Sequence, residues 1–178
     1  MTLQTVTWMS AFLCLAQVCS MPMPCQLQGQ LVVLSFFQGG HFPLECMQDN
    51  NVFIAFPATA FTTSGADPKA IYETLKNIDT LFGADDLPTK WDQRKLENFL
   101  NIVYRQIEES KCMMGSVNTC DYLVRVKVLK TYFRNIAAVL KEKNFSYCAW
   151  EVVRKELLYS LQFILEHNSD SLLWAKRT

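Results

Sequence analysis

A chain of 178 residues is long enough for one well-filled domain, and a composition that is 50% hydrophobic excludes an intrinsically disordered protein. The 17 Lys and Arg balance the 17 Asp and Glu, so the net charge gives no argument for nucleic acid or an anionic membrane as the main partner. After the N-terminal stretch, no segment is apolar for long enough to span a bilayer, so we expect no membrane insertion.

The N-terminal stretch, residues 1–20, carries no charged side chain and is apolar through its middle. Val18 and Ser20 suit cleavage before Met21. We therefore predict a secretory signal peptide over 1–20 and a secreted, extracellular domain over 21–178. The alternative is an N-terminal membrane anchor, but the apolar stretch is short and has no basic stop signal.

Residues 26–66 give the weakest pattern. Leu27, Leu31 and Leu34 have helical spacing, although LVVL and SFF would also suit a strand. We favour a short helix over 26–38, because no second strand is available for pairing. Residues 41–66 contain two prolines and an Asp-Asn-Asn run, which predict a long irregular connection.

Two amphipathic helices are expected next. Asp67 and Pro68 suit the N-cap and first turn of a helix that ends at Gly83. Thr89 and Asp92 have the spacing of a capping box, which predicts a second helix running to about Cys112. The apolar stripes of the two helices are Ile71, Leu75, Ile78 and Phe82, and Leu96, Phe99, Val103 and Ile107.

Two further helices follow a Gly-Ser-Asn stretch at 115–118. Their apolar stripes are Tyr122, Val126, Leu129, Phe133, Ile136 and Leu140, and Trp150, Val153, Leu157, Leu161 and Ile164. Each stripe needs a partner surface, so these helices are expected to form an all-α bundle.

Seven cysteines are present, of which Cys14 and Cys19 belong to the predicted signal peptide. Outside the cell, four of the other five would form two disulfides, and spacing alone allows about 15 arrangements. A zinc site is the rival interpretation, but no two cysteines have zinc-ligand spacing, and His41 and His167 are the only histidines. We therefore predict no metal. The five cysteines are Cys25, Cys46, Cys112, Cys120 and Cys148.

Residues 129–158 resemble the segment that joins the fourth and fifth helices of type I interferons. The shared motifs are LKEK at Leu140–Lys143 and CAWEVVR at Cys148–Arg154. The stretch that begins at Cys46, with Phe53 further on, is similar to the cysteine-led first long loop of that family. The four alignable cysteines resemble those of the four-cysteine (group II) interferons of fish.

This resemblance implies an up-up-down-down helical cytokine bundle of five helices, with a long first connection and two disulfides. The implied pairs are Cys25–Cys112 and Cys46–Cys148. It also implies binding to the ectodomains of a heterodimeric class II cytokine receptor, Janus kinase/STAT signalling and antiviral gene expression. Cofactors and catalytic residues are not expected, because the two histidines lack an obvious nucleophile and acidic partner.

The resemblance further implies that the last helix and the first long loop bind one receptor chain. The residues expected there are Met47, Asp49, Asn50, Arg154, Lys155, Leu158, Tyr159 and Gln162. The second receptor chain is expected on the opposite side, formed by the helices at 68–82, 90–112 and 121–143. From the pattern alone, an ordinary solvated helix face with a Glu151–Lys155 pair is the alternative.

The helical period places Arg154 away from the stripe of Trp150, so we expect its guanidinium to face water or a partner. We expect Trp150 in the core and the charges that follow it on the outside. Asn144-Phe-Ser146 is an N-glycosylation sequon.

Cys120 is the odd thiol in this pairing. We expect it to be buried and inert in a monomer, with a link between two chains as the alternative. A secreted helical bundle that carries an apolar ligand remains the alternative function, because such bundles can hold a pocket between their helices.

Overall fold

The computed structural model describes residues 40–61, 68–83, 87–111 and 120–167. Helices and connections make up these ranges, and they contain no strand, which confirms the predicted all-helical class. The elements are the 3-10 helices η1 (Leu44–Asn51) and η2 (Ala58–Ala60), and the α-helices α3 (Pro68–Phe82), α4 (Gln93–Ser110), α5 (Cys120–Glu142) and α6 (Tyr147–His167). The predicted signal peptide, the predicted helix over 26–38 and the predicted Cys25–Cys112 disulfide lie outside the described residues.

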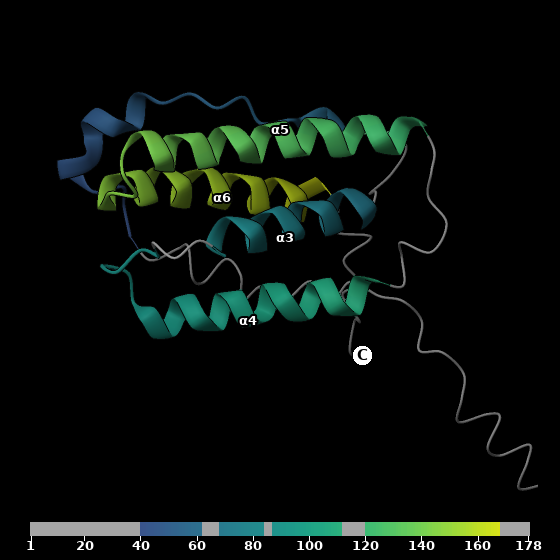
Figure 1. Ribbon diagram of the computed structural model, residues 1–178, viewed down its shortest axis with the longest axis horizontal. Coiled ribbons are helices and arrows are strands. Elements are labelled where there is room, and N and C mark those ends of the chain that lie inside the picture. The colour runs from purple at the N-terminus through teal and green to yellow at the C-terminus, as the bar shows by residue number, and fades with distance from the viewer. Residues whose placement is uncertain (1–39, 62–67, 84–86, 112–119, 168–178) are drawn as a thin grey trace, which may run out of the picture.

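The α-helices lie side by side along the long axis of the molecule (Figure 1). Helix α3 packs against both α4 and α5, and α5 packs against α6. In Figure 1, α3 and α5 run in one direction and α4 and α6 in the other. The directions of α3, α4 and α6 match the last three helices of an up-up-down-down bundle, with α5 as the additional helix. None of the described helices is long and apolar enough to cross a membrane.

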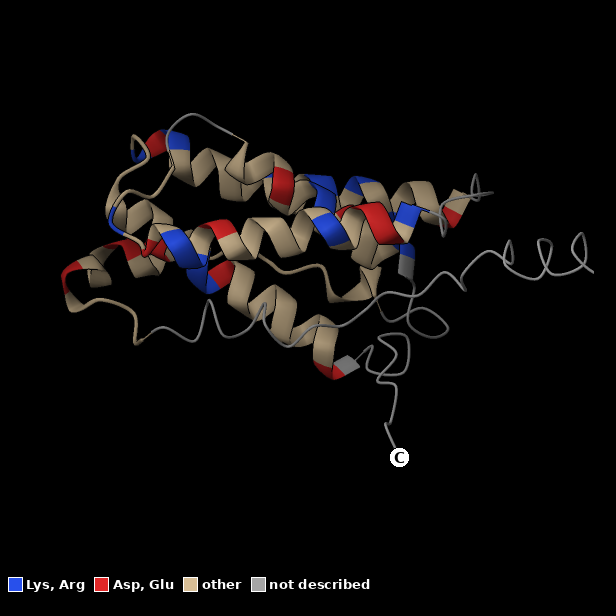
Figure 2. Cartoon of the chain, turned by 90° about the horizontal axis from the view of Figure 1, so that it is seen from below, with Lys and Arg blue, Asp and Glu red and all other residues tan. Residues whose placement is uncertain are grey.

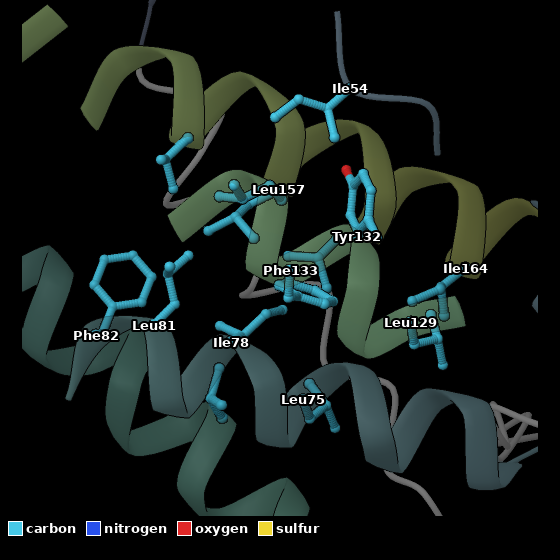
Figure 3. Packing of buried hydrophobic residues seen from close by; sticks show 14 of the residues in the cluster. Ile54, Leu75, Ile78, Leu81, Phe82, Leu129, Tyr132, Phe133, Leu157 and Ile164 are labelled. Atoms are coloured by element: carbon cyan, nitrogen blue, oxygen red, sulfur yellow. The ribbon is translucent and has the colours of Figure 1, made fainter. Parts of the chain in front are cut away.

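The predicted apolar stripes form the core. Every stripe residue of α3, α4 and α6 is buried, and on α5 only Tyr122 and Val126 are half-buried. Figure 3 shows Leu75, Ile78 and Leu81 of α3 pointing toward side chains of α5 and α6. The helical periodicity therefore predicted the buried face of each helix correctly.

An aromatic cluster closes one end of this core. The Trp150 ring stacks on Phe82 at a centroid distance of 5.2 Å and meets Trp91 edge-on at 5.8 Å. Phe82 also packs against Phe99 at 5.9 Å. Such contacts add to the free energy gained by burial, and they confirm Trp150 as a core residue.

The start of α4 differs from the prediction. Asp92 is the N-cap, and its carboxylate accepts a hydrogen bond from the Lys95 backbone N–H at 3.0 Å. Thr89 instead lies in the preceding turn, so the capping box from Thr89 to Asp92 is wrong. The carboxylate of Asp92 itself satisfies one of the unpaired N–H groups of the first turn.

Cys120 also differs from the prediction. It is the first residue of α5 and is exposed as a free thiol, so the expectation of a buried cysteine is wrong. The predicted stripe of α5 begins at Tyr122, and Cys120 lies away from it on the helix.

Candidate functional site

A disulfide joins the first connection to the last helix. Cys46 in η1 is bonded to Cys148 in the first turn of α6, with their Cα atoms 5.1 Å apart. η1 packs along α6, so two segments 102 residues apart in the sequence form one surface. This confirms the Cys46–Cys148 pair. We call the surface formed by residues 40–53 and α6 the α6–loop face.

Two loop residues of this face bind cations of the bundle. The Asp49 carboxylate pairs with Lys143, directly after α5. The Asn50 side-chain oxygen accepts a hydrogen bond from Lys155 Nζ at 3.0 Å, and Lys155 also lies 3.6 Å from Glu156. These contacts hold η1 against the helices. Three of the predicted receptor-binding residues, Asp49, Asn50 and Lys155, therefore already have partners within the chain.

Arg154 is covered by the first connection. Its Nε and Nη2 atoms both lie 2.8 Å from Glu151 Oε2, and Nη1 lies 3.4 Å from the backbone oxygen of Gly40. Trp91 Nε1 donates to the other Glu151 oxygen at 2.8 Å. The Arg154 and Glu151 side chains are only 13% and 4% exposed. Of the two expected environments, water or a partner, the Arg154 guanidinium therefore has partners, and they lie within the chain.

The physical reason is that a buried carboxylate must be paired and hydrogen-bonded. The helical period correctly points Arg154 away from the core stripe, but on that side Arg154 contacts Gly40 and lines a surface hollow together with Pro43 and Trp91. The Glu151–Lys155 pair, considered as an alternative, is replaced by Glu151–Arg154 at i,i+3.

Arg154→Ala should therefore destabilise the fold. Removing the guanidinium takes away the counter-charge of the buried Glu151 carboxylate and leaves it the hydrogen bond from Trp91 Nε1 at 2.8 Å. We expect the free energy of unfolding to fall by about 3 kcal/mol, the lower end of the cost of leaving a buried charge without its counter-charge. Chemical denaturation measures this change.

Arg105→Ala is the matched control for that measurement. Arg105 forms a more exposed i,i+4 pair with Glu109 at 3.6 Å, so its loss should cost at most about 0.5 kcal/mol. Equal effects of the two substitutions would contradict a buried role for Arg154.

A second buried carboxylate lies beneath the α6–loop face. The Tyr132 hydroxyl of α5 donates to Glu156 at 3.2 Å and lies 3.0 Å from the Ser160 hydroxyl. Burial raises the pKa of Tyr132 well above its usual range, and the Glu156 charge raises it further against a lowering by the Ser160 hydrogen bond. Glu151 and Glu156 are both buried, so the expectation that the charges after Trp150 face outward is wrong for these two acids.

The α6–loop face exposes large apolar side chains beside polar ones such as Glu45 and Gln48. Tyr159 and Met47 are about half exposed, at 54% and 49%, and the Tyr159 ring packs edge-on against Phe56 at 5.3 Å. Leu158 and Gln162 are half-buried. Leu44 and Phe53, which were not among the predicted receptor-binding residues, are 87% and 89% exposed. Exposed apolar side chains of this size mark candidate contact sites.

The period of a 3-10 helix explains one of the missed residues. Side chains three residues apart eclipse each other in such a helix, so Leu44 and Met47 lie on the same side of η1. The sequence predicted an irregular connection here, and an irregular connection gives no basis for grouping these two side chains.

Within the described residues, no group of three His, Cys, Asp or Glu side chains is placed to hold a metal ion. Two surface hollows, of about 290 and 230 Å³, are each lined partly by charged side chains.

The chain is similar to known interferons over most of its length. Residues 3–170 match the model of the interferon alpha/beta domain. The chain is 27% identical to human interferon alpha-7 over 155 residues, which is 82% of each chain. It is 32% identical to interferon alpha-1 of Equus caballus over 127 residues, 66% of this chain and 68% of the relative.

Two solved structures have the same arrangement of helices. Zebrafish interferon 2 is 40% identical, with a TM-score of 0.69 over 76% of this chain and 94% of that chain. Zebrafish interferon 1 is 24% identical, with a TM-score of 0.54 over 76% and 90%, and therefore supports the fold alone.

Proposed function

The chain belongs to the interferon alpha/beta family and is a type I interferon cytokine, not an enzyme, and we propose that it is secreted and bridges two receptor chains on the cell surface. Receptor pairing would activate Janus kinases and STAT proteins and induce antiviral genes. The observation that carries the proposal is the α6–loop face, which the Cys46–Cys148 disulfide holds together beside exposed apolar side chains.

We assign one receptor chain to this face. Tyr159 and Met47 are its proposed contact residues, because aromatic residues and methionine are enriched in protein interfaces. Leu158 and Gln162 flank them. The other predicted residues, Arg154, Lys155, Asp49 and Asn50, fix the loop against the helices, which reduces the entropy that binding would cost.

The second receptor chain is proposed to bind the opposite side of the bundle, formed by α3, α4 and α5. Two separate faces on one protein allow a monomer to bring two different receptor chains together. The heterodimeric receptor and the monomeric state of the cytokine are therefore parts of the same proposal.

Secretion requires the signal peptide proposed over 1–20, and it makes Asn144 a candidate for glycosylation. Asn144 is exposed in the turn between α5 and α6, with a φ of 48°. Asparagine is one of the few residues that adopt this left-handed conformation readily. A glycan at this position would extend from the end of the bundle into solvent.

The experiment that tests the proposed function is antiviral gene induction in zebrafish cells. Purified protein with its disulfides formed should induce antiviral transcripts at low concentration, and the same protein after reduction and alkylation should induce less. Lack of induction in cells with intact receptors would contradict the proposal. A carrier of an apolar ligand would instead show a melting temperature that rises when such a ligand is added.

A further inference from the structure

One side of α5 carries four cations and no acid. These residues are separated by steps of three, four and seven, so the 3.6-residue turn places them in one stripe. All four are exposed, on the side of the helix opposite the buried Leu129 and Ile136. We call them the α5 cationic face. They are Lys127, Lys130, Arg134 and Lys141.

The charge of this face is not balanced by the rest of the helix. The acids of α5 are Asp121 in the first turn and Glu142 at the last position. Among the salt bridges between described residues, none involves the α5 cationic face, and Arg134 donates only a long 3.4 Å hydrogen bond to Thr131. A cluster of one sign creates a local positive potential even in a neutral protein.

Helix α4 provides the contrast. Figure 2, which views the molecule from the α4 side, shows Lys and Arg interleaved with Asp and Glu along this helix. Arg105 pairs with Glu109, and Lys111 pairs with Glu108. Exposed helices in this protein therefore do not all carry an excess of cations.

A surface groove of about 290 Å³ runs beside the cationic face, between α3 and α5. Lys130, Arg134 and Lys141 line it from α5, and the neutral side chains Asn77 and Thr80 line it from α3. The rest of its lining is apolar, with Phe133 and Ala137 among it. The groove thus offers cations, hydrogen-bonding oxygens and an apolar surface, which suit the sulfate groups, hydroxyls and C–H faces of a sulfated sugar.

The α5 cationic face is long and narrow, so it suits an extended, linear ligand. Lys127 and Lys141 are 14 residues apart, which corresponds to about 21 Å along the helix axis. Surface patches of Lys and Arg are typical heparin sites, and charge-assisted hydrogen bonds to anionic oxygens are strong. We propose that the α5 cationic face binds a sulfated glycosaminoglycan of the cell surface along the axis of α5. The proposal goes beyond receptor binding and rests on the proposed secretion, and it places the glycosaminoglycan on the same side of the bundle as the proposed second receptor chain.

Heparin affinity tests this proposal directly. The variant K127Q/K130Q/R134Q/K141Q removes the face and keeps good helix formers. The control variant K90Q/R94Q/K95Q/K111Q removes the same number of charges from the α4 region. Wild type and control should be retained on heparin at about 0.15 M NaCl, near physiological ionic strength, whereas the α5 variant should not be retained. Thermal melts should show that both variants are folded.

Two further measurements define what would overturn the proposal. Soluble heparin hexasaccharide should elute the wild type, and hyaluronan, which carries carboxylates but no sulfate, should not. Equal elution by both polymers, equal loss of retention in both variants, or no retention of wild type would each overturn it. If the α5 variant kept its heparin retention and lost affinity for a receptor ectodomain, the face would serve an acidic protein partner instead. Heparin retention does not require a receptor, so failure of the proposed function would be recognised separately.

Discussion

Replacement of Cys46 and Cys148 by serine should lower the free energy of unfolding by as much as about 4–5 kcal/mol. The bridged residues are 102 apart, and in the chain-entropy model a loop of about 100 residues gives an effect of this size. The same substitution removes the covalent link between η1 and α6. We therefore expect weaker binding to the receptor chain assigned to the α6–loop face, measured by denaturant titration and by binding to each ectodomain.

Cys120→Ser is the matched control. Cys120 is an exposed free thiol, and an exposed substitution should change the free energy of unfolding by no more than about 0.5 kcal/mol. If the Cys46/Cys148 variant unfolded at the same denaturant concentration as this control, the disulfide would have no stabilising role.

Trp150→Ala should lower the free energy of unfolding by about 3–5 kcal/mol, the usual range for truncating a large buried aromatic side chain. Trp150 is 1% exposed, and its ring contacts Phe82 and Trp91. Its loss also disturbs the turn from which Trp91 donates a hydrogen bond to the buried Glu151. Antiviral activity should fall because less protein is folded.

Trp150→Phe separates loss of volume from loss of the aromatic stack. Phenylalanine keeps an aromatic ring beside Phe82, so this variant should retain more stability than Trp150→Ala. Guanidinium titration of both variants gives the comparison. A Trp150→Ala protein that unfolded like wild type would contradict the described core.

Helical periodicity was enough to predict most of the fold. The stripes of α3, α4 and α6 are buried because an amphipathic helix in a bundle must turn its apolar side inward. The same reasoning failed at Glu151 and left the partners of Arg154 open, since a helical period gives direction relative to the core only. It contains no information about a connection more than 100 residues earlier that contacts Arg154 on the outer side of the helix.

The candidate site was predicted from resemblance more than from pattern. The CAWEVVR motif led to the Cys46–Cys148 pair, which the structure contains. The distinction between exposed residues such as Tyr159 and internally paired ones such as Asp49 required three-dimensional contacts. Leu44 and Phe53 were missed for a related reason, because side-chain exposure in a connection depends on how the connection packs.

The affinity of Tyr159→Ala for each receptor ectodomain is the most direct test of the claim that the α6–loop face binds one receptor chain. Tyr104→Ala is the matched control, because Tyr104 lies on α4 and is 60% exposed, close to the 54% of Tyr159. We predict that Tyr159→Ala weakens binding to one ectodomain by at least about tenfold, or roughly 1.4 kcal/mol, with little change in melting temperature. Tyr104→Ala should leave binding to that ectodomain unchanged. Unaltered affinity of Tyr159→Ala for both ectodomains, or an equal loss in the two variants for the same ectodomain, would contradict the claim.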